Sequence, residues 1–250
     1  MLFGFDLNHL FLFPFQDRDA RKHFLIGCLI YLAGFVIPIL PWLVVTGYNA
    51  TLIRQVLNGE KPHLVAWENW ETLLKDGARL LGIRLVYSIP LFILMAPLFL
   101  MFFAMSLISV LAQTSDGQSV ELAFFFLALV FIGGGLLMLP VSLIIALIVP
   151  AAETHAVAND DFSAGFRVQD WWPIFKKNWG GFVVALAILY ALIMVMSVVR
   201  QFMFFTIVLM CLFPIVISVL SMYMGVVQYV TFAQAYKDGK DSLRRDTQAV

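Results

Sequence analysis

The chain has 250 residues, of which 62% are hydrophobic and only 13% are charged, and its mean hydropathy is +0.91. A soluble domain of this size is about half apolar and about a quarter charged, so the composition excludes an ordinary soluble domain. Sixteen Lys and Arg residues balance sixteen Asp and Glu residues. No basic stripe with interleaved aromatic side chains occurs, which argues against a nucleic-acid partner.

Membrane helices are the first elements that the chain predicts. Its apolar runs are each at least as long as the ~18 residues that mark a membrane-helix candidate. These runs cover roughly 24–57, 80–112, 120–150, 181–199 and 202–235. We therefore expect an integral membrane protein with one polytopic membrane domain over residues 1–250.

The positions of Lys and Arg indicate how the first run folds. Cytoplasmic segments beside membrane helices carry the excess of these residues, and five spans would put the cations at 18–22 opposite the C-terminus. A break at Pro38 and Pro41 removes this conflict, because proline lacks a backbone donor and clashes with the preceding helical turn. Every Lys and Arg except Arg200 then lies on one face, which we interpret as cytoplasmic together with both termini.

The predicted fold is all-α, with six membrane helices in three repeated hairpins at about 23–57, 79–158 and 180–236. The first hairpin is short, because helices of about 15 residues cover only about 21 Å at 1.5 Å per residue. A hydrocarbon core is about 30 Å thick. We therefore expect this hairpin either to be re-entrant or to thin the bilayer locally.

An amphipathic, aromatic-rich segment precedes each predicted hairpin, at about 11–22, 64–78 and 168–179. The second and third segments share the pattern W-x2-[LI]-[LF]-K, in which Trp70 aligns with Trp171. We interpret this alignment as part of an internal helical repeat, since such repeats are common in polytopic proteins. Chance similarity between apolar hairpins is the alternative.

Tryptophans give these segments their predicted role. In the second segment apolar residues recur at three- and four-residue spacing and share one face of a helix; they are Trp67, Trp70, Leu74, Ala78 and Leu81. Tryptophan favours the headgroup level of a bilayer, as in an interfacial helix. We predict interfacial anchoring or partner docking for Trp67, Trp70, Trp171, Trp172 and Trp179.

Several motifs together resemble a known family. They are FPFQDRDARKHFLIG at 13–27, Gly47-Tyr48, the stretch 54–77, LVYSIP at 85–90 and DDFSAGFRVQDWWPIFKKNWGGF at 160–182. In this order they resemble a domain-of-unknown-function family of small polytopic membrane proteins from bacteria and archaea. Val65 departs from the pattern, which has a second proline just before the tryptophan. The resemblance implies the membrane fold, but no particular activity, substrate or cofactor.

Polar candidates for a site are few. Glu153 and His155 follow Pro150 near a helix end and could bind a cation or relay a proton, although residues two apart do not share a helical face. Gln228 and Gln234 on the last helix could form hydrogen bonds between helices. No GxSxG motif, nucleotide-binding loop or metal-ligand spacing occurs, so we expect no enzyme, cofactor or metal.

The leading functional hypothesis is a non-enzymatic scaffold or accessory subunit of a complex in the cell membrane. Its expected partners are membrane lipids and either another membrane protein or further copies of the chain. The alternative is a permease-like transporter of an apolar or lipid-like solute, since such a path needs no buried charge. A membrane-embedded enzyme acting on lipid, with Glu153 and His155 as its candidates, is the third hypothesis.

Overall fold

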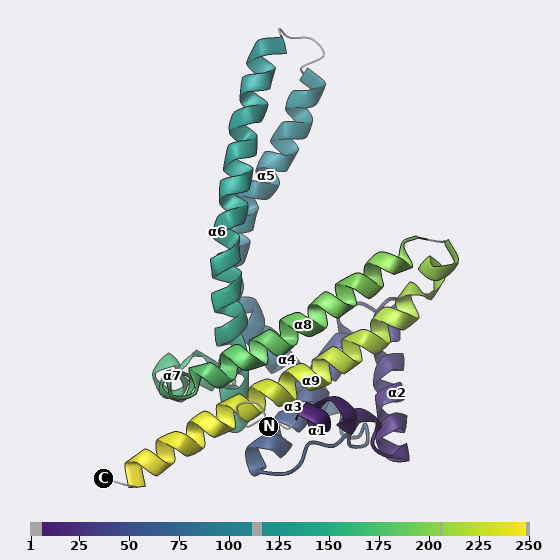
Figure 1. Ribbon diagram of the computed structural model, residues 1–250, viewed down its shortest axis with the longest axis vertical. Helices are drawn as coiled ribbons and strands as arrows, with labels where there is room; N and C mark the ends of the chain where they lie inside the picture. Colours follow the sequence, from purple (N-terminus) through teal and green to yellow (C-terminus); the bar gives the residue numbers. More distant parts are fainter. Residues whose placement is uncertain (1–6, 112–116, 206, 249–250) are drawn as a thin grey trace. The chain divides into compact units, whose positions relative to one another are not determined.

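The structure is a computed structural model that describes residues 7–111, 117–205 and 207–248, and every regular element in that part of the chain is a helix (Figure 1). The described residues form two compact units. The base unit comprises the described residues up to Arg84 and from Val149 onward, and the hairpin unit comprises Leu85–Ile148.

The base unit begins with α1 (Leu7–Leu12), a 3-10 turn (Phe13–Phe15), α2 (Arg18–Ala33) and α3 (Leu40–Asn58). The side chain of Asp17 caps α2 by accepting a hydrogen bond from the Ala20 amide at 2.9 Å. The predicted break near Pro38 is confirmed, because residues 34–39 separate the two helices and proline lies in the first turn of α3.

Helix α4 (Trp70–Tyr87) starts later than the sequence predicted, because residues 60–69 form no helix. Its buried face also differs from the predicted one, which ran from Trp67 through Leu81. The buried residues of α4 are Leu73, Asp76, Gly77, Leu80 and Ile83. The helix therefore buries a charged carboxylate and a glycine against the base unit and turns its outer apolar residues away from it.

The remaining helical elements of the base unit come after residue 158. They are a 3-10 turn (Ser163–Phe166), α7 (Val168–Lys177), α8 (Trp179–Met203) and α9 (Ile207–Gln248). Helices α8 and α9 lie side by side and antiparallel (Figure 1), and α9 also contacts α2, α3 and α7. Helix α9 is therefore the element against which most of the base unit packs.

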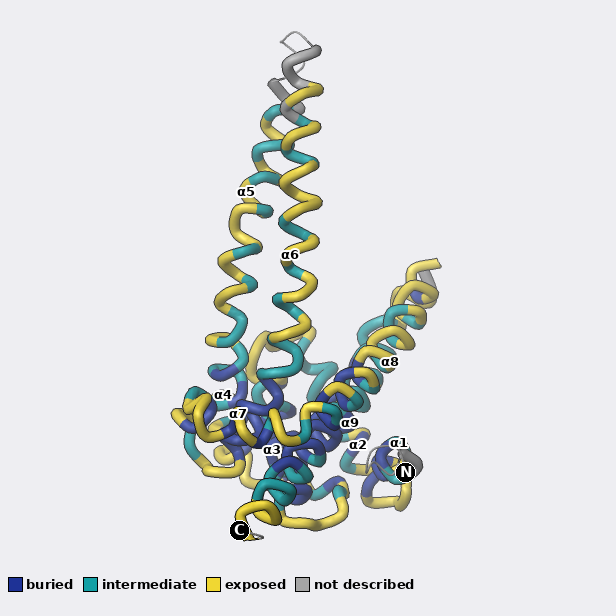
Figure 2. Tube along the Cα trace, turned by 60° about the vertical axis from the view of Figure 1, so that its left-hand side comes forward, coloured by how far each residue is buried: buried dark blue, intermediate teal, exposed yellow. Residues whose placement is uncertain are grey.

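The hairpin unit contains α5 (Ile89–Leu111) and the first part of α6 (Gly117–Ala158). Exposed residues run along α5 and much of this part of α6, whereas buried residues concentrate in the helices of the base unit (Figure 2). Within the hairpin unit a methyl group added at Gly134 would meet the Leu98 side chain at 2.5 Å. The two helices are thus in close contact there.

Four helices of the described chain are long and apolar enough to cross a membrane. These spans are Ile89–Ile108, Phe124–Ala158, Trp179–Met203 and Leu209–Gln248. Helices α2 and α3 are not among them, so the predicted arrangement of six spans in three repeated hairpins is not confirmed. The all-helical class is confirmed for the described residues.

Candidate functional site

The segment before α4 is held inside the base unit by an aromatic stack. The ring of Trp67 stacks on Tyr48 of α3 at 3.9 Å between centroids. The indole N–H of Trp67 donates to the His23 carbonyl oxygen of α2 at 2.9 Å, and the Tyr48 hydroxyl donates to the Val65 carbonyl oxygen at 2.8 Å. The Tyr48 bond satisfies a carbonyl of the irregular segment, which has no helical donor, and the Trp67 bond ties this segment to α2.

Two glycines bring the backbones of α3 and α4 into direct contact. A methyl group added at Gly47 would lie 1.8 Å from the Leu73 carbonyl oxygen, and one added at Gly77 would lie 1.9 Å from the Leu43 carbonyl oxygen. The contact is reciprocal, and only a residue without a side chain fits at either point. Gly47 and Gly77 both belong to the motifs on which the family resemblance rests.

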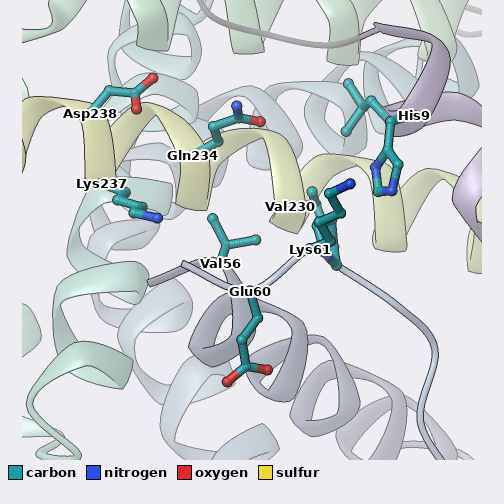
Figure 3. Close-up of a pocket in the computed structure, with 10 residues that line it drawn as sticks. His9, Val56, Glu60, Lys61, Val230, Gln234, Lys237 and Asp238 are labelled. Atoms are coloured by element: carbon teal, nitrogen blue, oxygen red, sulfur yellow. The ribbon is translucent and has the colours of Figure 1, made fainter. Parts of the chain in front are cut away.

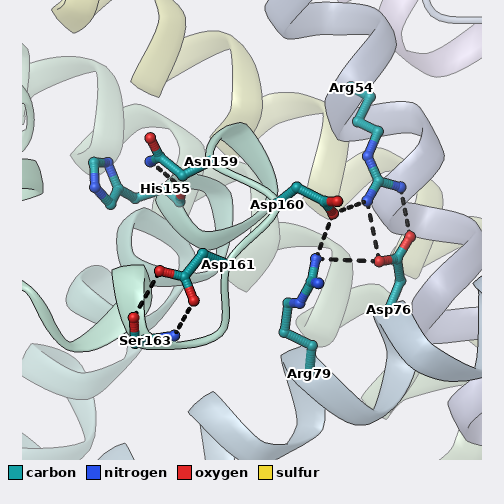
Figure 4. Close-up of polar contacts among 8 residues, drawn as sticks. All are labelled: Arg54, Asp76, Arg79, His155, Asn159, Asp160, Asp161 and Ser163. Atoms are coloured by element: carbon teal, nitrogen blue, oxygen red, sulfur yellow. Dashed lines mark hydrogen bonds and ion pairs between the residues drawn. The ribbon is translucent and has the colours of Figure 1, made fainter.

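Charged residues form ion pairs beside the same contact between α3 and α4 (Figure 4). Arg54 of α3 donates two hydrogen bonds to Asp76, at 2.5 and 3.0 Å, and Arg79 lies 3.4 Å from the same carboxylate. Asp160 accepts from Arg79 at 2.7 Å and from Arg54 at 3.2 Å. These bonds, and first that from Arg79, lower the pKa of Asp160.

The start of the motif at 160–182 makes a local structure of its own (Figure 4). Asp161 accepts hydrogen bonds from the amide and hydroxyl of Ser163 at 2.9 and 2.6 Å and pairs with Arg167 at 2.5 Å, and the Ser163 bonds are the larger cause of its lowered pKa. The Trp171 indole donates to the Gly165 carbonyl oxygen at 3.2 Å. All of these contacts join residues that are no more than six positions apart in the chain.

Glu153 and His155 leave α6 in different directions. Arg84 donates to the two oxygens of Glu153 at 3.0 and 3.1 Å and to the Tyr229 hydroxyl at 2.8 Å. Nδ1 of His155 lies 2.5 Å from the Tyr236 hydroxyl. The two side chains therefore do not form one site. This agrees with their two-residue spacing, which places them on different helical faces. The charge of the buried Glu153 is balanced by Arg84.

A pocket of about 390 Å³ lies beside this ion pair, between α2, α3 and α9. Its polar lining includes Asn49, Arg84, Ser218, Gln228 and Tyr229, and its apolar lining includes Tyr31, Phe35, Trp42 and Ile217. Asn49 is only 2% exposed, and its side-chain oxygen has no hydrogen-bond partner. The pocket thus combines an unsatisfied buried acceptor with aromatic walls.

A second pocket, of about 300 Å³, lies where α9 passes the chain after α3 (Figure 3). Its lining is mostly charged or polar and includes His9, Glu60, Lys61, Gln234, Lys237 and Asp238. The predicted residues Gln228 and Gln234 therefore line different pockets. Among the described residues, no three His, Cys, Asp or Glu side chains are placed to hold a metal ion together.

The tryptophans predicted to lie at a membrane interface divide into two groups. Trp70, Trp172 and Trp179 are exposed, whereas Trp67 and Trp171 are buried. The two buried rings pack inside the base unit instead of presenting a face to lipid or a partner. Sequence analysis missed Asn49, and it missed Arg84 as the partner of Glu153, because each lies far along the chain from the groups it meets.

The described structure is that of a helical membrane protein whose polar contacts gather in the base unit. Residues 30–205 match the family described as Protein of unknown function (DUF4013), and the chain belongs to this family. No curated protein and no solved structure matches the chain. The resemblance seen in its motifs is therefore confirmed, and the family description assigns no activity.

Proposed function

We propose that this protein is a multi-pass, non-enzymatic scaffold or accessory subunit of a complex in the cell membrane. Both termini lie at the cytoplasmic face, and the hairpin unit packs against a partner protein within the bilayer. The observation that carries the proposal is the hairpin unit itself, because no residue in the most apolar stretch of α5 is buried within the protein.

The distribution of charge supports the orientation. In the antiparallel pair α8 and α9, Asn178 donates to the Ala235 carbonyl oxygen at 2.8 Å, and Lys177 pairs with Asp246. The cations of 237–245 therefore lie at the end of the pair where α8 begins, and Arg200 lies near the opposite end. A cationic end is the cytoplasmic end by the positive-inside rule.

The glycines of α6 support helix packing in the hairpin unit. Gly134 faces Leu98 of α5, whereas an added methyl group at Gly133 or Gly135 would meet nothing within 4 Å. Small residues let the backbones of membrane helices approach closely, and association in lipid depends on such packing because apolar area alone gives no driving force there. Gly133 thus offers room for a helix of a partner protein on a face that α5 does not cover.

Purification from native membranes in a mild detergent tests the proposal. We expect mass spectrometry to identify a stoichiometric membrane-protein partner that Gly133→Leu releases. Phe131→Leu is the matched control, because Phe131 is exposed and, two residues from Gly133, lies on another face of the same helix. A monodisperse, partnerless monomer would contradict the proposal, and a complex containing only copies of this chain would replace the partner with a homo-oligomer. Transport of a lipid-like solute stays a prediction, which solute flux in vesicles tests.

A further inference from the structure

The pocket between α2, α3 and α9 is lined by an asparagine side chain whose hydrogen bonds the protein leaves unsatisfied. The Asn49 side-chain oxygen has no partner although the residue is almost fully buried. An unpaired buried acceptor costs about 1–3 kcal/mol, so native proteins seldom keep one without a ligand, water or ion. The pocket volume of about 390 Å³ is roughly ten times the ~30 Å³ share of one water molecule. It falls within the common size of ligand pockets.

The electrostatics of the pocket favour an uncharged ligand. Arg84 lines the pocket, but both oxygens of Glu153 accept hydrogen bonds from it, so the pair carries no net charge. The side chain of Arg84 is 43% exposed. Its hydrogen bonds within the described chain come from Nε and Nη2, and none comes from Nη1. One donor thus remains for a neutral oxygen, whereas an anion would have to compete with Glu153 for the guanidinium.

The two ends of the pocket differ in polarity. Toward one end lie Asn49, Arg84 and Tyr229, and a methyl group added at Gly225 would lie 3.4 Å from the Asn49 side-chain nitrogen. Toward the other end lie Phe35 and Trp42, both exposed, at the turn between α2 and α3, together with Ile217. From 218 to 229 along α9 is about 16 Å at 1.5 Å per residue. This gradient matches a molecule with a polar head and a hydrocarbon tail.

We propose that this pocket binds an uncharged amphiphile with a hydroxyl-bearing head and one hydrocarbon tail. One head oxygen accepts from the Asn49 side-chain nitrogen, and a second head oxygen accepts from Arg84. The tail lies between Ile217, Phe35 and Trp42, where it continues into the lipid around the exposed aromatic rings. The proposal concerns a ligand of the base unit and does not depend on a partner at the hairpin unit.

Monoolein is the probe that tests this site, because it joins a glycerol head to one acyl chain without a charge. We expect the full-length protein in detergent to bind one monoolein per chain by native mass spectrometry and to unfold at a higher temperature in its presence. Asn49→Leu should weaken binding at least about tenfold, which corresponds to about 1.4 kcal/mol. Asn58→Leu, at an exposed asparagine near the end of the same helix, should leave binding unchanged.

A second variant keeps the test decisive if Asn49→Leu fails to fold. Ser221 is a half-buried lining residue, so Ser221→Leu fills the pocket without replacing a core side chain and should also abolish monoolein binding. Absence of binding to the native protein, or equal binding by both variants, would overturn the proposal. Preferred binding of 1-oleoyl lysophosphatidate that Arg84→Gln abolishes would overturn it too, because the site would then select an anion.

Discussion

The two tryptophan-rich segments, 64–78 and 168–179, resemble each other in sequence but differ in what they hold together. The first has its buried ring, Trp67, in an irregular stretch and bonds it to α2 and α3. The second has its buried ring, Trp171, inside a helix and bonds it to Gly165, six residues away. The buried tryptophan of the first segment therefore joins parts of the chain that are distant in sequence, whereas the indole bond of the second is local.

This difference corrects the residue equivalence that the shared pattern suggested. The pattern aligns Trp70 with Trp171, yet Trp70 is 49% exposed and Trp171 is 1% exposed. By burial and by its indole hydrogen bond, Trp67 is the counterpart of Trp171. A short sequence match between apolar hairpins thus does not fix which residues have the same role, and four predictions test the contrast between the two segments.

The largest effect is expected where the first segment joins α3 through its backbone. Gly77→Ala should lower the free energy of unfolding by at least about 3 kcal/mol, the upper part of the overpacking range, because the new methyl group would meet the Leu43 carbonyl oxygen at 1.9 Å. Gly180→Ala, beside the second segment, has open space and should be neutral or stabilising by up to about 1 kcal/mol.

Both glycine variants can be measured by circular dichroism during denaturation in detergent. Maleimide labelling of the buried Cys28 gives an independent reading once the exposed Cys211 is replaced by serine. If Gly77→Ala and Gly180→Ala unfold at the same denaturant concentration as the native chain, α3 and α4 do not touch as described.

The ion pairs of the two segments should differ by a smaller amount. Asp76 is buried between Arg54 and Arg79, so Asp76→Asn leaves two partly buried cations with only the exposed Asp160 as a partner and should cost about 3 kcal/mol. Asp246 pairs with Lys177 at an exposed position, and Asp246→Asn should cost about 0–1 kcal/mol. Chemical denaturation compares them, and equal costs would show that the Asp76 network is not buried.

Replacing each buried tryptophan with phenylalanine, which removes the indole N–H, should affect the two segments differently. Trp67→Phe and Trp171→Phe each remove one hydrogen bond to a carbonyl oxygen, at about 0.5–1.5 kcal/mol. Trp67 also lies against Gly27, beside Cys28. Labelling of Cys28 below the unfolding transition should therefore accelerate in Trp67→Phe and stay at the native rate in Trp171→Phe. Acceleration in both variants, or in neither, would contradict the assigned contacts.

The smallest effect is expected from pH. The hydrogen bond from Arg79 is the first cause that holds the pKa of Asp160 below its ordinary value, which is roughly 3.9. The folded state then binds this proton less readily than the unfolded state, so the stabilisation is present above the ordinary pKa and is lost as pH falls through the folded pKa. Melting temperatures between about pH 5 and 3 should fall less in Asp160→Asn than in the native chain; parallel curves would exclude this contribution.

Much of the fold could be predicted from the sequence because it depends on local patterns. Apolar length predicted the membrane helices, proline chemistry predicted the break at 34–39, and the motifs predicted the family. The start of α4 could not be predicted, because the spacing from Trp67 to Leu81 fits a helix, whereas long-range hydrogen bonds keep Trp67 outside one. Tertiary contacts override a periodic pattern in such a case.

The candidate site was less predictable, because its contacts join residues that no spacing rule connects. Glu153 stood out as a carboxylate near a proline, but no pattern connected it with Arg84, because their pairing spans 69 residues. Asn49 lies within an apolar run, where a single amide has no distinguishing pattern. Only the packing of α2, α3 and α9 places it at a pocket.

The central claim is that Trp67 and Trp171 are interior side chains while Trp70, Trp172 and Trp179 face outward. Fluorine NMR of the protein carrying 5-fluorotryptophan tests this most directly, with the resonances of its six tryptophans assigned by single Trp→Phe variants. A soluble paramagnetic ion and a spin-labelled lipid should together broaden the resonances of the three outward rings and leave those of Trp67 and Trp171 sharp. Broadening of the Trp67 resonance to the same extent as that of Trp70 would contradict the account.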